Sequence, residues 1–154
     1  MKTSARGLAD IVYSEGEILT AYADWLPSAQ RYDVWTIGIG HTSAAGPPVV
    51  YKGMTITHEQ ALSILANDLT AVELRVVHAL GASQPQNVVD GAVSFDFNCG
   101  GILRASWPAL FLAGKMEEAE AHFLLWDQPA EIIGRRKREA NLIFRGIYHT
   151  PAAT

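Results

Sequence analysis

The stretch Trp35-Thr36-Ile37-Gly38-Ile39-Gly40, at positions 35–40, decides the fold class of this chain. It consists largely of an aromatic residue, β-branched residues and glycines, which is typical of a strand punctuated by glycine. The 3.6-residue period of helices is absent between residues 19 and 51, so a hairpin or a small three-stranded sheet fits there. Helical periodicity dominates the rest of the chain. The sequence therefore predicts an α+β fold, mostly α, with one small β element near the N-terminus.

The remaining apolar pattern predicts several helices. The longest begins at Thr57, which with Gln60 can form a reciprocal capping box, and ends at Gly81. Its length would allow it to bridge two lobes. We expect helices at about 4–15, 57–80, 106–113, 116–126 and 130–146. A further helix is expected to start near Pro85, to be buried nearly all round from Val88 to Asn98, and to end at Gly100-Gly101.

Composition limits the classes of function. The chain has 154 residues and 49% hydrophobic residues, which suits one domain with its own core. Twelve Lys and Arg against 16 Asp and Glu argue against a general nucleic-acid binder. The single Cys99 excludes an internal disulfide, and the five His show no metal-ligand spacing. We therefore expect no nucleic-acid partner, no metal and no cofactor.

Targeting signals are also missing from the pattern. No apolar run approaches the roughly 18 residues of a membrane helix. The first 16 residues lack the apolar stretch of a signal peptide. We therefore expect no signal peptide and no stable membrane insertion, and we expect the chain to fold in the cytoplasm where it is made.

Two carboxyl groups stand out as candidates for chemistry. Glu15 is expected at the C-terminal end of the first helix, where the negative end of a helix dipole favours the uncharged form of a carboxyl group. Asp24 follows after eight residues, at the start of the predicted sheet. Glycoside hydrolysis needs two carboxyl groups, one of which must hold a proton to donate. Spacing alone is weak support, because acidic residues at helix ends are usually only solvated.

Four ordered motifs strengthen this interpretation. The chain resembles the phage-type lysozymes, the endolysins of tailed bacteriophages that form glycoside hydrolase family 24, over nearly its whole length. The matching segments are Glu15-Gly16 with Tyr22-x-Asp24 and Trp35 to Thr42, Gly53 to Thr57 before the long helix, Val93 to Gly100, and Gly134 to Glu139 with Leu142 to Phe144.

The resemblance implies a lysozyme-like, two-lobed fold and a muramidase. We expect a single domain over 1–154, with an N-terminal lobe at about 15–56, an interlobe helix at about 57–80, and a helical C-terminal lobe at about 82–150 that includes the first helix. The implied substrate is bacterial peptidoglycan, cleaved at the β-1,4 bond between N-acetylmuramic acid and N-acetylglucosamine. In that reaction Glu15 would be the general acid, Asp24 would activate or orient water, and Thr36 would supply a hydroxyl group.

One segment departs from the family pattern. The run from Trp25 to Trp35 is longer than the family usually has, so the hairpin carries an insertion near 26–31. Loops tolerate such growth at little cost in closure entropy. The insertion leaves two candidates for the second carboxylate. Asp24 keeps the spacing to Glu15, whereas Asp33 lies closer in sequence to Thr36.

Other residues have plausible supporting roles. Tyr22, Trp25 and Gly40 are expected to contact substrate, whereas Trp107 and Trp126, in helical segments, are expected in the core. His41 is expected to pair with Asp68 and to lock the sheet to the long helix. Arg135 matches the first Arg of the family's C-terminal motif and is expected to support the site. Asn98 is a second candidate supporting residue, although its place at the end of a buried helix makes a helix cap its usual role.

Two rival functions remain. A lytic transglycosylase needs only the glutamate, so the presence of Asp24 and Thr36 argues against it. A catalytically silent wall-binding protein of the same fold is the other. As an endolysin the chain is expected to be a monomer that stays in the host cytoplasm until a separate holin-like pore lets it reach the periplasm and the cell wall.

Overall fold

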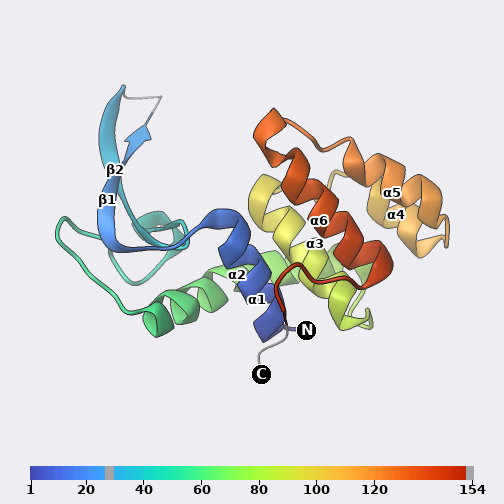
Figure 1. Cartoon of the computed structure of the whole chain (residues 1–154), viewed down its shortest axis with the longest axis horizontal. Coiled ribbons are helices and arrows are strands. Elements are labelled where there is room, and N and C mark those ends of the chain that lie inside the picture. The colour runs from blue at the N-terminus through green and yellow to red at the C-terminus, as the bar shows by residue number, and fades with distance from the viewer. Residues whose placement is uncertain (27–29, 152–154) are drawn as a thin grey trace. The chain divides into compact units, whose positions relative to one another are not determined.

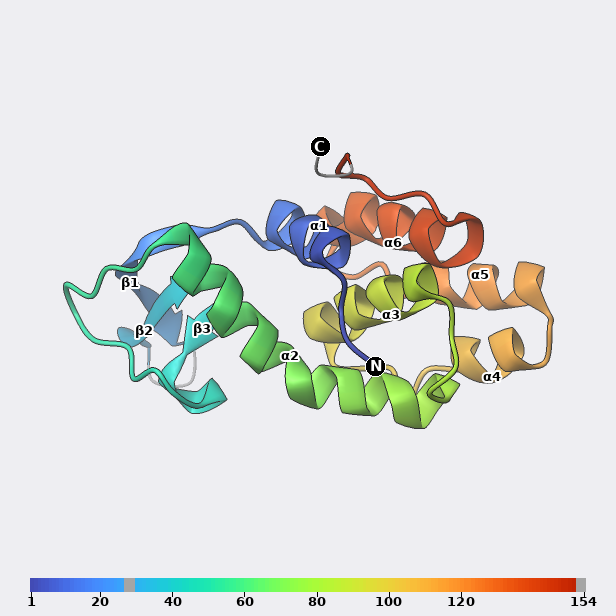
Figure 2. The ribbon, with the colours of Figure 1, turned by 90° about the horizontal axis from the view of Figure 1, so that it is seen from below.

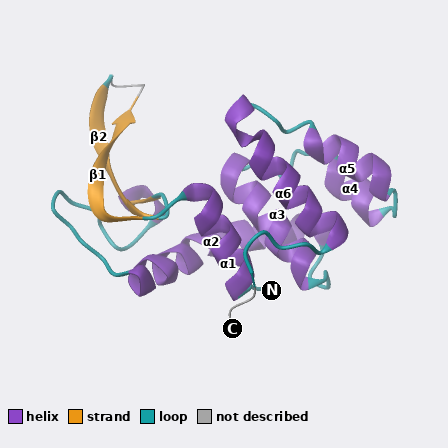
Figure 3. Cartoon of the chain, viewed as in Figure 1, coloured by secondary structure: helices purple, strands orange, loops and turns teal. Residues whose placement is uncertain are grey.

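The computed structural model describes residues 1–26 and 30–151. This part of the chain contains six helices, two short 3-10 helices and three strands. Its ribbon is drawn in Figure 1, and Figure 3 colours it by secondary structure. In chain order the elements are α1 (Ala5–Glu15), β1 (Ile18–Leu26), β2 (Arg31–Gly38), β3 (His41–Thr42), η1 (Ser43–Ala45), α2 (His58–Leu80), α3 (Gln86–Cys99), α4 (Trp107–Leu112), α5 (Met116–Leu124), η2 (Ala130–Ile132) and α6 (Ile133–Arg145).

The chain forms two compact units. The sheet unit comprises residues 12–68, and the helical unit comprises residues 1–11 and 69–154. α1 and α2 each contribute residues to both units. The lobe boundaries that the resemblance implies stay a prediction.

The sheet unit is built on a three-stranded antiparallel sheet in the order β1-β2-β3 (Figure 2). β2 is the central strand, so Thr36 has a cross-strand partner on each side, Tyr22 on β1 and Thr42 on β3. A tight turn joins β2 to β3, and its Gly40 has a φ of +71°. This backbone conformation is one that glycine adopts without strain.

The buried face of the sheet unit is apolar. Ile37 and Ile39 from the central strand and its turn are almost fully buried, as are Ala61 and Leu65 from α2. A Cβ atom on Gly38 would lie 3.6 Å from the Cβ atom of Ala61. A side chain would make only ordinary contact at that distance, so the φ of +66° at Gly38, and not lack of space, favours glycine at the end of β2.

α2 begins at the capping box that the sequence predicts. The Gln60 amide N–H donates to Thr57 Oγ1 at 3.1 Å, and the Thr57 amide N–H donates to Gln60 Oε1 at 2.8 Å. Two of the amide groups at this helix end therefore have partners. Gly81, with a φ of +83°, follows the last residue of the helix.

The helical unit is organised around α3, which is buried along most of its length. α6 packs against it, and α5 packs against α6 and α4 (Figure 2). A Cβ atom on Gly91 would lie 2.4 Å from Ile143 Cγ1, so the glycine is what allows α3 and α6 to approach. Phe95 meets Trp107 edge to face, with ring centroids 5.6 Å apart, in the aromatic core of this unit.

The predicted fold class is confirmed, and most helix bounds agree closely with the expected ones. The segment 130–146 differs, because it divides into η2 and α6. Trp126 is a correction: α5 ends at Leu124, and the indole is only partly buried. Arg136 Nε donates to the Trp126 carbonyl oxygen at 2.6 Å, so a side chain, and not a further helical turn, satisfies that group. Trp107 is fully buried, as expected.

Within residues 1–26 and 30–151, none of the helices has the length and apolar character needed to cross a bilayer.

Candidate active site

The sheet unit contains a pocket of about 300 Å³ at the end of α1. The side chains and backbone that line it are those of Glu15, Gly16, Ile18, Tyr22, Asp24, Thr36, Gly38, Gly40 and Thr42. Five of these residues, Glu15, Tyr22, Asp24, Thr36 and Gly40, are among the six site residues that the sequence predicts within this unit, and the sixth is Trp25. The structure thus brings an exposed carboxyl pair and several hydroxyl groups to one hollow.

The position of Glu15 is set by the way α1 ends. Glu15 is the last residue of the helix, and Gly16, with a φ of +79°, turns the chain away. The Gly16 amide N–H still donates to the Val12 carbonyl oxygen at 2.8 Å. One residue further on, Glu17 Oε1 lies 2.6 Å from His58 Nδ1 of α2. The turn that carries Glu15 is therefore held on both sides.

The other polar side chains come from one face of the sheet. Tyr22 lies directly opposite Thr36, and Thr36 lies directly opposite Thr42. Asp24 is two residues along β1 from Tyr22 within a regular stretch of pairing, so it shares that face. Its Oδ1 accepts a hydrogen bond from the Trp25 amide N–H at 2.9 Å, which fixes the orientation of the carboxylate.

Thr36 carries an unsatisfied hydroxyl group at the pocket. The residue is only 3% exposed, and within the described residues its Oγ1 atom has no partner in hydrogen-bond geometry. A buried polar group without a partner costs about 1–3 kcal/mol, so the pocket favours a ligand or a water that can bind this hydroxyl.

The environment keeps the Tyr22 hydroxyl protonated. Burial raises the pKa of this phenol, and the negative charges of Asp24 and Glu15 raise it further. The neighbouring Thr36 hydroxyl acts in the opposite direction and lowers the pKa of Tyr22. In neutral solution the Tyr22 hydroxyl therefore keeps its proton and can act as a hydrogen-bond donor.

The structure does not bring every predicted residue to this pocket. Trp25, which the sequence predicts as a substrate contact, is 45% exposed and is not among the lining residues; the pairing of β1 with β2 is irregular between Asp24 and Trp25. Arg135 and Asn98 belong to the helical unit. Residues 27–29 of the insertion and the Asp33 side chain lie outside the described part of the structure, so the choice between Asp24 and Asp33 stays a prediction.

The sequence prediction missed one hydroxyl group of the site. Thr42 lines the pocket because β3 pairs with β2 and places it opposite Thr36. The available signal was the tight turn at Gly40, which returns the chain beside its own strand within a few residues.

Comparisons with known proteins show the family of this chain. The family model described as phage lysozyme matches residues 13–140. The chain belongs to the phage lysozyme family. It is 34% identical over 149 residues to the endolysin of Salmonella phage P22, an alignment that covers 92% of this chain and 97% of that protein.

Solved structures of phage lysozyme type have the same fold. An endolysin from Escherichia coli O157:H7 phage FAHEc1 superposes with a TM-score of 0.82 at 28% identity, covering 97% of this chain and 98% of that one. The muramidase domain of SpmX from Asticaccaulis excentricus superposes with a TM-score of 0.76 at 27% identity, covering 97% of this chain and 99% of that one.

In this phage lysozyme family member, a buried histidine braces the sheet beside the pocket. His41 is 1% exposed, with Nδ1 2.7 Å from Asp68 Oδ2 and Nε2 2.9 Å from the Pro48 carbonyl oxygen. A carbonyl oxygen only accepts, so Nε2 carries a hydrogen and one further proton is shared between Nδ1 and Asp68. Burial raises the pKa of Asp68, and the contact with His41 lowers it in part.

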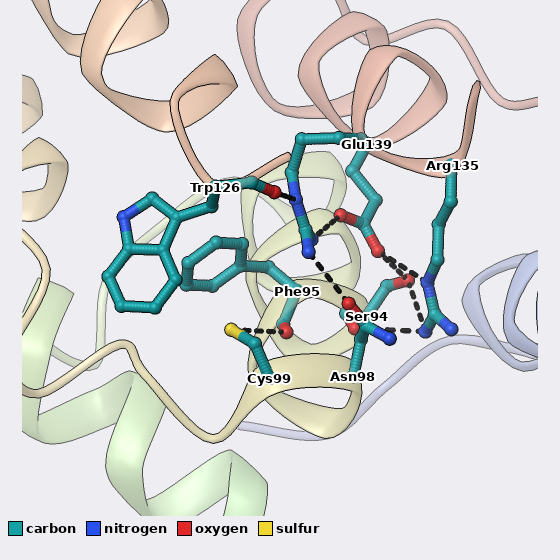
Figure 4. A network of polar contacts seen from close by, with 8 residues as sticks. Ser94, Phe95, Asn98, Cys99, Trp126, Arg135 and Glu139 are labelled. Carbon is teal, nitrogen blue, oxygen red and sulfur yellow. Dashed lines mark hydrogen bonds and ion pairs between the residues drawn. The ribbon is translucent and has the colours of Figure 1, made fainter. Parts of the chain in front are cut away.

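The Arg-Arg-x-x-Glu motif of the phage lysozyme family forms a buried polar network (Figure 4). Glu139 Oε1 accepts hydrogen bonds from Arg135 Nε at 2.8 Å and from Ser94 Oγ at 2.6 Å, while Oε2 pairs with Arg136. Arg135 also donates to the Ser94 carbonyl oxygen at 3.0 Å. These contacts give Arg135 a structural role in joining α6 to α3.

Asn98 also belongs to this network. Its Oδ1 accepts from Arg136 Nη2 at 2.7 Å, and Gly100, in the left-handed conformation, caps the helix instead. The expectation that Asn98 caps α3 is therefore wrong. Its side chain binds Arg136, and Gly100 adopts the left-handed conformation of the cap at lower cost than asparagine would.

The described residues contain no group of three or more His, Cys, Asp or Glu side chains arranged to hold a metal ion.

Proposed function

We propose that this protein is an endolysin that hydrolyses the β-1,4 bond between N-acetylmuramic acid and N-acetylglucosamine in bacterial peptidoglycan. The observation that carries the proposal is the pocket that Glu15, Asp24 and Thr36 line together, in a chain of the phage lysozyme family. A carboxyl group that donates, a carboxylate that accepts and a hydroxyl that orients are the groups that glycoside hydrolysis needs.

The proposed reaction uses these groups in one displacement. The Glu15 carboxyl gives its proton to the glycosidic oxygen as the bond from that oxygen to the anomeric carbon breaks. A water molecule attacks the anomeric carbon from the opposite face and transfers a proton to Asp24. The Thr36 hydroxyl binds the water and limits its orientation. Proton exchange with solvent then restores Glu15 and Asp24 for the next turnover.

Because water attacks directly, the proposal predicts inversion at the anomeric carbon. Proton NMR of a cleaved soluble glycan, recorded before mutarotation, should show the α anomer first. An initial β anomer would indicate a covalent intermediate and would contradict the role given to water.

The experiment that tests the general acid is loss of turbidity of purified peptidoglycan. Glu15→Gln should reduce the rate by about 10²–10⁴-fold, because a positioned acid or base contributes about that much. Glu59→Gln is the matched control, since Glu59 is an exposed residue in the first turn of α2 within the same unit and does not line the pocket. Equal rates for Glu15→Gln and the control would refute the role of Glu15.

The choice of second carboxylate needs a separate pair of variants. Asp24→Asn should lose most of the activity and Asp33→Asn should keep it, because Asp24 lines the pocket with Thr36. The reverse result would assign the water to Asp33.

The route to the wall forms a further part of the proposal, which rests on the likeness to endolysins. The protein is proposed to act as a monomer, to accumulate in the host cytoplasm, and to reach peptidoglycan through a separate holin-like pore. Light scattering coupled to size-exclusion chromatography tests the first point. Fractionation of expressing cells, with and without a pore-forming protein, tests the others; periplasmic activity without the pore would contradict them.

A further inference from the structure

A row of three hydroxyl side chains crosses the sheet at the pocket. Tyr22, Thr36 and Thr42 occupy directly opposed positions on β1, β2 and β3, and all three line the pocket. Directly opposed residues on neighbouring strands lie close enough for their side chains to interact. The proposed reaction uses only the middle one.

The surroundings of Thr36 determine the direction in which its hydroxyl proton points. A threonine hydroxyl has one proton to donate and lone pairs that accept. Thr36 Oγ1 is buried and has no hydrogen-bond partner within the described part of the chain. If its proton points away from the pocket, it offers an incoming water no donor. A neighbour that donates to Thr36 would leave the Thr36 proton free to point at the water.

Tyr22 is suited to be that neighbour. It lies across from Thr36, and the carboxyl groups of Asp24 and Glu15 lie close enough to disfavour a negative charge on its oxygen. The phenol therefore keeps its proton in neutral solution. Hydrogen bonds of this kind are often long in a free enzyme and tighten in its complexes.

We propose that Tyr22 is a positioning residue that acts through Thr36 on the hydrolytic water. The Tyr22 O–H donates to Thr36 Oγ1, the Thr36 O–H donates to the water oxygen, and the water donates toward Asp24. Tyr22 keeps its proton throughout, so it adds nothing to the proton balance of the reaction. The inference rests on the proposed hydrolysis and adds a direction to its hydrogen bonds.

The test is a set of variants assayed on a soluble, uncrosslinked peptidoglycan glycan, with kcat and KM measured separately. Tyr22→Phe removes one oxygen atom and should lower kcat about tenfold with KM changed less than twofold, because one oriented hydrogen bond to the reacting water is lost. Tyr51→Phe is the control, since Tyr51 is 60% exposed in the same unit and does not line the pocket. It should match the parent protein.

Action through Thr36 is tested by repeating Tyr22→Phe in two backgrounds. In Thr36→Ser, which keeps a hydroxyl, Tyr22→Phe should still lower kcat about tenfold. In Thr36→Val, which has no hydroxyl to direct, Tyr22→Phe should change kcat less than twofold. A merely structural role would give the same loss in both backgrounds together with a lower melting temperature.

Three results would overturn the inference. These are an unchanged kcat for Tyr22→Phe, a loss confined to KM, and a tenfold loss of kcat that persists in the Thr36→Val background. If the parent protein releases new reducing ends and one of these results is found, only the role of Tyr22 fails. If the parent protein releases none, the proposed hydrolysis and the inference fail together.

Discussion

The buried carboxylate of Glu139 offers the sharpest test of how the helical unit is held together. Glu139 is 4% exposed and lies between two arginines that are themselves buried, Arg135 at 6% and Arg136 at 1%. Its two oxygens accept from both guanidinium groups and from Ser94. Glu139→Gln keeps the volume and one oxygen but replaces the negative charge.

The expected cost follows from what the substitution leaves behind. Whichever way the Gln amide is turned, its NH2 group faces an N–H donor of a buried arginine, and the two positive charges lose the negative charge that they share. Breaking a buried pair in this way costs about 3–5 kcal/mol. For a chain of this size that lowers the melting temperature by about 6–20 °C.

The assay is chemical denaturation followed by circular dichroism, with Glu118→Gln as the control. Glu118 is exposed on α5 in the same unit, so its substitution should change the free energy of unfolding by less than about 0.5 kcal/mol. If Glu139→Gln falls within that range, the carboxylate does not hold α6 to α3 and the interpretation of Figure 4 is wrong.

Three other predictions concern stability. Burial and the Asp90 carboxylate raise the pKa of Tyr148 to about 12, so the stability given by its neutral hydroxyl is complete below pH 10 and is lost as the pH rises toward 12. Between pH 10 and 12 the free energy of unfolding should fall about 1 kcal/mol more for the parent protein than for Tyr148→Phe, because solvent around the partly exposed hydroxyl weakens the full effect. An equal fall for both proteins would contradict this. Asp68→Ala should cost about 1–3 kcal/mol by leaving buried His41 without its partner, as measured in urea, whereas Asp68→Asn, which keeps a hydrogen bond, should cost less. Gly91→Ala should destabilise by about 1–3 kcal/mol because its Cβ would lie 2.4 Å from Ile143, and an unchanged melting temperature would show that α3 and α6 can separate freely.

Local signals predicted much of this fold. The capping box at Thr57 and Gln60 and the stop at Gly81 fix the ends of α2, because both act through backbone groups within a few residues. The strand predicted at 35–40 is partly correct: Trp35 to Gly38 belong to β2, which begins earlier, at Arg31, whereas residues 39–40 form the turn to β3. Carboxyl spacing and motif order also indicated that Glu15 and Asp24 belong to one site.

Features that depend on tertiary packing could not be predicted. Thr42 enters the pocket only because β3 folds back on β2, and Asn98 loses its expected cap role only because Arg136 reaches it from α6. Trp126 lies beyond the end of α5, and its indole is only partly buried, against Phe95 of α3. Each of these outcomes is decided by a residue far away in the sequence, which periodicity and spacing do not report.

The central claim is that the pocket of Glu15, Asp24 and Thr36 hydrolyses the glycan of peptidoglycan. The most direct measurement is mass spectrometry of purified sacculi digested in water enriched in oxygen-18. The account predicts new reducing muramic acid ends that carry the heavy oxygen, and none with Glu15→Gln. Ends in the 1,6-anhydro form, without the label, would instead identify a transglycosylase, and the absence of new ends would leave a wall-binding protein; either result would contradict the claim.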